Sequence, residues 1–270
     1  MTDLSMEQIW ELANNFNVYD KKFLLSFIRE GDYAHAGEEE AIELVMSHFP
    51  KDGNRKILDV ACGLGGTAHY IQKHGWGLVT GFDIDNESIQ YATSKYPCEI
   101  FFVADVSNIS NRIESPDFDL IYIMNAFYCF TDQLQCLKEL RKLAKPSTKL
   151  VIFEYTDLKE KNNSLSDRKE DVYFKPIRPS EIDILVSEAD WETIMYIPLN
   201  STFKNWYKNF LDRVDLKRHL IEERFGKNTT TCILEKYNPL YYRLKNKSLG
   251  GCLIILSPKG RSSHSKMNQL

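Results

Sequence analysis

The sequence predicts an α/β protein with a mostly parallel sheet that helices cover on both faces. Three observations lead to this prediction. Short apolar runs alternate with helical patterns between residues 50 and 155, the first three runs each carry an acid at or near the end, and a glycine turn follows the first run. With 270 residues, 43% of them hydrophobic, the chain can bury one large domain or one domain with a cap.

The first predicted strand covers residues 57–60, where branched and apolar side chains indicate burial on both faces of a sheet. Three glycines follow within residues 63–66 and allow a tight turn that side chains would block, and residues 67–74 carry a helical pattern. A strand, a glycine turn and a helix together place free backbone N–H groups beside a ligand. This stretch therefore predicts a site for a nucleotide-like cofactor.

The other elements follow from the spacing of apolar residues. Further strands are predicted over 77–83, 99–105, 118–124, 149–154, 191–198 and 250–256, the last of which completes the sheet. Helices are predicted within 5–48 and over 86–95, 134–143, 179–189, 201–225 and 233–244. Residues 155–178 are polar and irregular, and we interpret them as a connection or lid.

These elements divide the chain into a core and its additions. We expect an N-terminal helical cap over 1–50, a cofactor-binding core over 51–200 and 248–258, a helical cap insertion over 201–247 and a flexible tail over 259–270.

The acids at the strand ends indicate which cofactor the glycine turn serves. The turn alone fits a GxGxxA dinucleotide pattern, but Asp59 before it would repel a pyrophosphate and could accept a hydrogen bond from a cationic amine. Asp83 is placed to take both hydroxyls of a ribose, and Asp105 can accept from the exocyclic amine of adenine. Each acid could instead cap a helix or turn. Together they describe S-adenosylmethionine.

At this point the sequence resembles the class I S-adenosylmethionine-dependent methyltransferases, with a core of the type 11 (UbiE-like) kind. The resemblance covers about residues 50–155 and leaves Ala61 where the family's turn usually has its first glycine. It is carried by Ile57-Leu-Asp-Val-Ala-Cys-Gly-Leu-Gly-Gly66, Gly81-Phe-Asp-Ile-Asp85, Val103-Ala-Asp105, Asp117-Phe-Asp-Leu-Ile121 and Lys149-Leu-Val-Ile-Phe-Glu154. It implies a Rossmann-like fold with a seven-stranded, mostly parallel sheet whose last strand is antiparallel.

The resemblance also implies roles for individual residues. The methionine end of the cofactor is expected at Asp59, Ala61, Gly63 and Gly65, and the ribose at Asp83. The adenine is expected beside Ile84, Asp105 and Val106, with Asn125 and Ala126 closing the pocket.

Methyl transfer is an in-line displacement, so a general base is needed only when the nucleophile carries a proton at neutral pH. The candidate catalytic residues are Tyr33 and His35, in a loop flanked by glycines, and Tyr128, after the fourth strand. Each of them could equally be a packing residue. We predict no metal site, because the six cysteines form no CxxC pair and no metal-like group with histidine.

The segment 31–37 and the two-helix insertion are loosely similar to the sarcosine, dimethylglycine and phosphoethanolamine N-methyltransferases. This similarity favours a small-molecule acceptor, and an amine in particular. An aromatic cap could bind the resulting ammonium by cation–π attraction, although residues at such helical spacing are more often core. The residues of this predicted cap are Tyr33, Tyr128, Phe203, Trp206 and Tyr207.

Other functions stay open at this stage. The acceptor could be a lipid, a quinone or another oxygen or carbon nucleophile, and the amphipathic helix at 201–225 could meet a membrane surface. The fold could also serve as a regulatory module that binds S-adenosylmethionine without turnover, or as an NAD(P) oxidoreductase, against which Asp59 argues.

The net charge and the targeting signals of the sequence indicate which partners and which cell compartment to expect. The formal net charge of −4 gives no global field that calls for nucleic acid, so none is expected. We see neither a signal peptide nor an apolar run long enough to span a bilayer, and we expect reduced, mostly buried cysteines. These observations predict a cytoplasmic protein.

Overall fold

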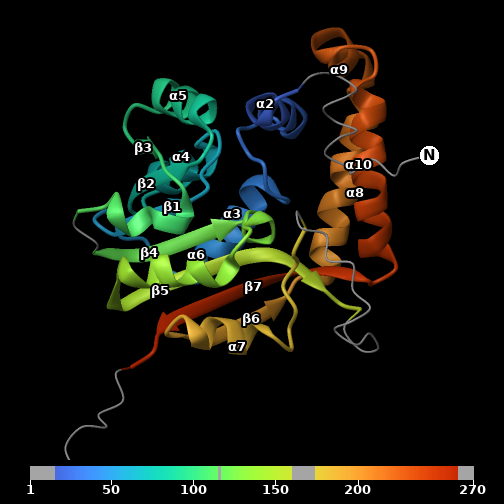
Figure 1. Cartoon of the computed structure of the whole chain (residues 1–270). Helices are drawn as coiled ribbons and strands as arrows, with labels where there is room; N and C mark the ends of the chain where they lie inside the picture. Colours follow the sequence, from blue (N-terminus) through green and yellow to red (C-terminus); the bar gives the residue numbers. More distant parts are fainter. Residues whose placement is uncertain (1–15, 115–116, 160–173, 261–270) are drawn as a thin grey trace, which may run out of the picture.

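The computed structural model describes residues 16–114, 117–159 and 174–260 (Figure 1). Its centre is a seven-stranded sheet in the order β3-β2-β1-β4-β5-β7-β6. The strands are β1 (Lys56–Val60), β2 (Leu78–Asp83), β3 (Ile100–Val103), β4 (Phe118–Met124), β5 (Ala144–Asp157), β6 (Trp191–Pro198) and β7 (Leu249–Pro258). The β1–β2, β1–β4, β2–β3 and β4–β5 pairs are parallel.

The last strand is antiparallel to both of its neighbours, β5 and β6. It lies between them rather than at the edge of the sheet, so β6 forms the edge. This arrangement confirms the predicted fold class, a Rossmann-like methyltransferase fold with an antiparallel last strand.

Helices cover both faces of the sheet. They are α2 (Val18–Arg29), α3 (Glu38–Met46), α4 (Gly66–Lys73), α5 (Asn86–Lys95), α6 (Gln133–Lys142), α7 (Ile182–Glu188), α8 (Asn200–Leu216), α9 (Arg218–Phe225) and α10 (Thr229–Lys245), with short 3-10 turns η1 (Val106–Asn111) and η2 (Phe127–Cys129). One hydrophobic core joins the sheet to α2, α3, α4, α8 and α10, and a second joins it to α6 and α7.

Successive side chains of β1 point to opposite faces of the sheet and therefore belong to different hydrophobic cores. Leu58 and Val60 belong to the core under α6 and α7, whereas Ile57 belongs to the opposite one. Asp59 shares the face of Ile57, so its carboxylate lies on the side of the sheet that carries α2 and α4.

The helix predicted over 201–225 is two helices, α8 and α9, which meet at Lys217. The apolar stripe of α8 ends at Val214, and Leu216 faces solvent with 85% of its surface exposed. Helix α9 is held separately, by buried Ile221 and by Phe225, whose ring packs against Phe23 and Phe27 of α2.

The apolar face of α8 packs inward, onto β7 and α10. Phe203, Trp206 and Tyr207 are therefore buried core residues and do not line the main cavity, which corrects the interpretation of them as an aromatic cap. The same burial removes this face from contact with a membrane surface. Within the described ranges, no helix combines the length and apolarity that crossing a bilayer requires.

Some expectations fall outside the described residues: the first predicted helix up to residue 15, most of the predicted lid (160–173) and the tail from 261. Near the lid, β5 extends to Asp157, and Ile177 forms a bridge with Thr156. The proposed domain boundaries stay predictions. Four of the six cysteines are buried and all six are free thiols.

Candidate functional site

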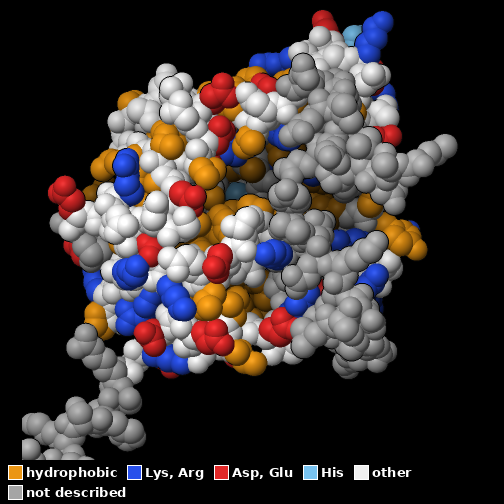
Figure 2. All heavy atoms as spheres, in the orientation of Figure 1, with side chains coloured by type: hydrophobic (Ala, Val, Ile, Leu, Met, Phe, Trp, Pro, Cys, Tyr) orange, Lys and Arg blue, Asp and Glu red, His pale blue; other side chains and the backbone are white. Residues whose placement is uncertain are grey.

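A cavity of about 540 Å³ lies at the carboxyl ends of β1, β2 and β4, between these strands, α2 and the loop 31–37. Figure 2 shows the corresponding hollow on this face, with apolar side chains in its depth and acidic ones at its rim. The carboxyl end of a parallel sheet is where α/β folds bind their ligands. The cavity is therefore the candidate site.

The glycine turn forms the floor of the cavity. Ala61, Gly63 and Gly65 all have positive φ, at 59°, 54° and 82°. The loop 31–37 rests on this turn, because a Cβ at Gly66 would lie 2.6 Å from the carbonyl oxygen of Asp32. Glycine is required here for close approach, and the turn opens toward the cavity.

Asp59 lies at the bottom of the cavity with 3% of its surface exposed. Its Oδ2 has no hydrogen-bond partner among the described residues. Burial raises the pKa of Asp59 to about 7; the hydroxyl of Tyr122 opposes this shift, and the neighbouring Asp83 carboxylate adds to it. A buried carboxylate with an unpartnered oxygen fits a ligand that brings a cationic amine.

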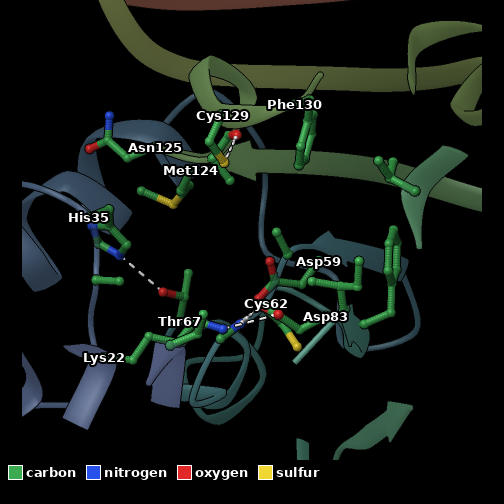
Figure 3. A pocket seen from close by; sticks show the side chains of 18 of the residues that line it. Lys22, His35, Asp59, Cys62, Thr67, Asp83, Met124, Asn125, Cys129 and Phe130 are labelled. Atoms are coloured by element: carbon green, nitrogen blue, oxygen red, sulfur yellow. Dashed lines mark hydrogen bonds and ion pairs between the residues drawn. The ribbon is translucent and has the colours of Figure 1, made fainter. Parts of the chain in front are cut away.

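Asp83, at the end of β2, is nearly buried and already has three donors. Its Oδ2 accepts from the N–H of Gly63 at 2.8 Å. Its Oδ1 accepts from the N–H of Asp85 at 3.0 Å and from the ammonium of Lys22 at 3.0 Å. Figure 3 shows Lys22 extending from α2 into the cavity toward Asp83. Sequence reasoning missed Lys22, because nothing in the spacing of α2 marks that position.

The third acid, Asp105, is exposed and caps η1, where its Oδ1 accepts from the N–H of Ser107 at 2.8 Å. The capping alternative therefore holds for one of its oxygens. Asp105 also lines the cavity beside Val106 and Ile84, and Ile84 is 68% exposed. An exposed isoleucine next to an acid offers a flat, apolar surface with one acceptor, as an adenine ring needs.

His35 is buried, and burial lowers its pKa to about 4. Its Nδ1 lies 3.1 Å from the carbonyl oxygen of Ala36, which can only accept, so Nδ1 carries the proton. Nε2 then accepts from the hydroxyl of Thr67 at 3.0 Å. The imidazole is neutral at physiological pH, and its acceptor nitrogen points to a cavity-lining hydroxyl, as Figure 3 shows.

The two candidate tyrosines also border the cavity. The hydroxyl of Tyr33 donates to Glu39 at 3.2 Å, and burial raises the pKa of Tyr33 above its usual range. Burial raises the pKa of Tyr128 as well. Both hydroxyls stay protonated at neutral pH, so neither tyrosine is an effective base.

A buried carboxylate on β5 supports this end of the site and was not predicted from the sequence. Glu154 accepts from the Nδ2 of Asn125 at 3.2 Å and from the N–H of Tyr128 at 3.0 Å. Asn125 in turn accepts from the N–H of Ala36 at 3.0 Å. The only feature of the sequence that could have indicated this role is the position of Glu154 at the end of an apolar strand.

The structure brings twelve of the thirteen predicted site residues to the wall of this one cavity. They are Tyr33, His35, Asp59, Ala61, Gly63, Asp83, Ile84, Asp105, Val106, Asn125, Ala126 and Tyr128. The exception is Gly65, where a Cβ would lie 2.9 Å from the ring of Phe101. Gly65 therefore serves the packing of the turn against β3.

The sheet order, the antiparallel last strand and the cavity at the strand ends define a methyltransferase-type fold. Comparison with known proteins agrees: residues 58–152 match the methyltransferase domain family. This match gives residues 58–152 a methyltransferase domain, and the sheet order supports a class I S-adenosylmethionine-dependent methyltransferase fold around it.

Two curated relatives illustrate the range of similar proteins. Cycloartenol-C-24-methyltransferase 1 of Oryza sativa subsp. japonica is 31% identical over 127 residues, which are 43% of this chain and 36% of the relative. The phosphoethanolamine N-methyltransferase of Plasmodium falciparum is 26% identical over 155 residues, which are 56% of this chain and 58% of the relative. The chain thus spans between about a third and three-fifths of these relatives.

Among solved structures, the fold is similar to phosphoethanolamine N-methyltransferase 2 of Haemonchus contortus, in complex with phosphomonomethylethanolamine and S-adenosylhomocysteine. The TM-score is 0.77 at 16% identity, over 96% of this chain and 61% of that one. At this identity, the likeness supports the fold.

Proposed function

We propose that the chain transfers a methyl group from S-adenosylmethionine to a small-molecule acceptor, with an amine favoured. The observation that carries this proposal is the meeting of Asp59, Asp83 and Asp105 around one cavity above the glycine turn. Their separation along three adjacent strands suits an amine, a ribose diol and an adenine, in that order.

Each acid then has a distinct task. Asp59 binds the cationic amine of the cofactor, Asp83 binds the ribose hydroxyls and Asp105 receives the adenine amine. The bound cofactor supplies an electrophilic methyl group on a sulfonium. The protein's contribution is to hold the acceptor in line with that methyl group and to exclude water.

The acceptor end of the cavity lies beside His35, Thr67 and Asn125. Among the candidate catalytic residues, His35 suits the role of proton acceptor best, because its imidazole is neutral and its Nε2 has a lone pair. The hydroxyl of Thr67, which donates to Nε2 and also lines the cavity, gives its proton to His35 as it takes the proton of the acceptor.

The charge of the cavity favours an amine. Five aspartates line the described part of the cavity. Lys22 is the single lysine or arginine in that lining. An anionic surrounding stabilises an acceptor that becomes a substituted ammonium. The names of the two relatives cover both an amine and a sterol acceptor, so lipid and quinone acceptors belong in the test.

The test is methyl transfer from methyl-labelled S-adenosylmethionine to a panel of amines, phenols, hydroquinones and sterols. We expect product with at least one amine, and a large loss of rate in His35→Gln with cofactor affinity unchanged. Transfer only to a hydroquinone or sterol would contradict the amine assignment. Tight cofactor binding without any transfer would support the binding-module alternative instead.

A further inference from the structure

The side chain of Lys22 lies across the part of the cavity in which the proposed function places the ribose. Its ammonium is 3.0 Å from Asp83 Oδ1 and 3.6 Å from Asp85 Oδ2, and it donates to Ser88 Oγ at 3.2 Å. Its Cδ lies 3.8 Å from the position that a Cβ at Gly63 would take. The lysine therefore covers both the glycine turn and the acid of β2.

The acceptor positions of Asp83 can be counted. An ionised carboxylate has about four lone-pair positions, two on each oxygen. Gly63 and Lys22 use one position on Oδ2 and one on Oδ1, and the N–H of Asp85 uses the second position on Oδ1. One position is left, whereas a ribose diol donates two hydrogen bonds.

We propose that Lys22 is an internal competitor of the cofactor, whose ammonium must leave Asp83 before a ribose diol can bind with both hydroxyls. This inference rests on the proposed function, because it assumes that Asp83 receives the ribose. Release of Lys22 frees one position on Oδ1 beside the one on Oδ2. The carboxylate then matches the diol.

Helix α2 itself stays in place during this exchange. Leu24 and Ile28, on its inner face, are fully buried in the core. Its first residues are tied to α5, because the Nδ2 of Asn17 donates to Glu87 at 2.6 Å. A rotation of the lysine side chain is therefore the smallest motion that clears Asp83.

Asp85 provides a place for the released ammonium. Its Oδ2 is already 3.6 Å from Lys22 Nζ, and only 15% of its side chain is exposed. The charge of Lys22 thus keeps a partner after it leaves Asp83, which lowers the cost of the exchange. Lys22 sets the cofactor affinity by how strongly it holds Asp83.

Titration calorimetry with S-adenosylhomocysteine tests this inference on the full chain. Lys22→Met removes the competing charge and keeps the length of the side chain, so it should tighten binding by about tenfold, the equivalent of one charge-assisted hydrogen bond. Lys22→Arg keeps a cation and should bind within about threefold of the wild type. Lys21→Met, the same exchange one residue earlier on α2, is the matched control and should change nothing.

A ligand with one hydroxyl separates competition from general loosening of the site. The 2′-deoxy analogue of S-adenosylhomocysteine needs a single position on Asp83, which is open beside Lys22. Lys22→Met should therefore improve its affinity by less than about twofold.

The outcomes distinguish the two proposals. If neither the wild type nor Lys22→Met binds S-adenosylhomocysteine, the proposed function is wrong. If the wild type binds and Lys22→Met binds equally or more weakly, Lys22 supports the cofactor and the competition is overturned. An equal gain for the full and the 2′-deoxy ligand would overturn it too.

Discussion

The carboxamide of Asn125 donates to the buried carboxylate of Glu154, with 3.2 Å between Nδ2 and Oε1. The other side of the same carboxamide accepts from the backbone of Ala36 at 3.0 Å. One side chain thus connects the end of β4, strand β5 and the loop that carries His35. Burial raises the pKa of Glu154 to about 7, while hydrogen bonds from Tyr155, Tyr128 and Asn125 oppose that shift.

Substitution of Asn125 should separate these hydrogen bonds from backbone strain, because the residue has a φ of 50°. Asn125→Gly keeps the left-handed backbone and loses the carboxamide, so it should lower the free energy of unfolding by about 1–3 kcal/mol. Asn125→Ala adds the strain of a Cβ and should cost about 1 kcal/mol more. Urea denaturation measures both values; equal stability of the two variants would contradict the assigned strain.

His35 should make the folded state sensitive to acid. The pKa of its imidazole is lowered to about 4 by burial, so between pH 6.5 and 4 the unfolded chain binds a proton that the folded chain does not. Stability from this group is therefore present above pH 6.5 and is lost as the pH falls toward 4. The difference in unfolding free energy between the wild type and His35→Gln should shrink over that range.

Exposed His219 provides the control for this measurement. His219→Gln should change the pH dependence of unfolding much less than His35→Gln does. A stability difference for His35→Gln that stays constant between pH 7 and pH 4 would show that the imidazole is not buried in its neutral form.

Cofactor binding should release a proton from Asp59. Burial raises its pKa to about 7, so most of the carboxyl groups are protonated at pH 6, whereas a bound ammonium favours the ionised form. Calorimetry of S-adenosylhomocysteine in buffers of different ionisation enthalpy should show release of about one proton at pH 6 and almost none at pH 8.5. Asp59→Asn should abolish the release; a wild type with no proton release at pH 6 would contradict the role of Asp59.

Ala61 should be a source of strain in the glycine turn. Its φ of 59° lies in the left-handed region, which a Cβ disfavours by roughly 1–2 kcal/mol. Ala61→Gly removes this strain but adds chain entropy to the unfolded state, so we expect a net gain of about 0.5–1 kcal/mol in unfolding free energy. The same exchange at helical Ala92 should cost about 1 kcal/mol or more, and destabilisation at both positions would contradict the strain.

Sequence reasoning predicted the sheet and the cofactor side of the cavity, because these depend on short-range patterns. Asp59 lies in β1, Asp83 ends β2 and Asp105 follows β3; these strands are adjacent, and parallel strands bring their carboxyl ends to one edge. The glycine turn is equally local. The position of His35 and Tyr128 beside the same cavity follows from their place in loops at that edge.

The contacts that cross between distant elements could not be predicted. Lys22 meets Asp83 across 61 residues, and Asn125 meets Ala36 across 89, and neither pair has a spacing that marks it. The aromatic residues of α8 failed as cap residues for a related reason. Helical spacing shows that Phe203 and Trp206 share a face, but only the packing shows that this face meets the core.

The most direct test of the cofactor site is the affinity of S-adenosylhomocysteine for the wild type and Asp83→Ala, measured by calorimetry on protein whose folding is verified. We expect one binding site in the wild type and at least about a hundredfold weaker binding in Asp83→Ala, since two hydrogen bonds to a charged acceptor are lost. Asp117→Ala, which removes an exposed acid paired with Lys56, is the control and should bind like the wild type. Equal binding by the wild type and Asp83→Ala would contradict the site.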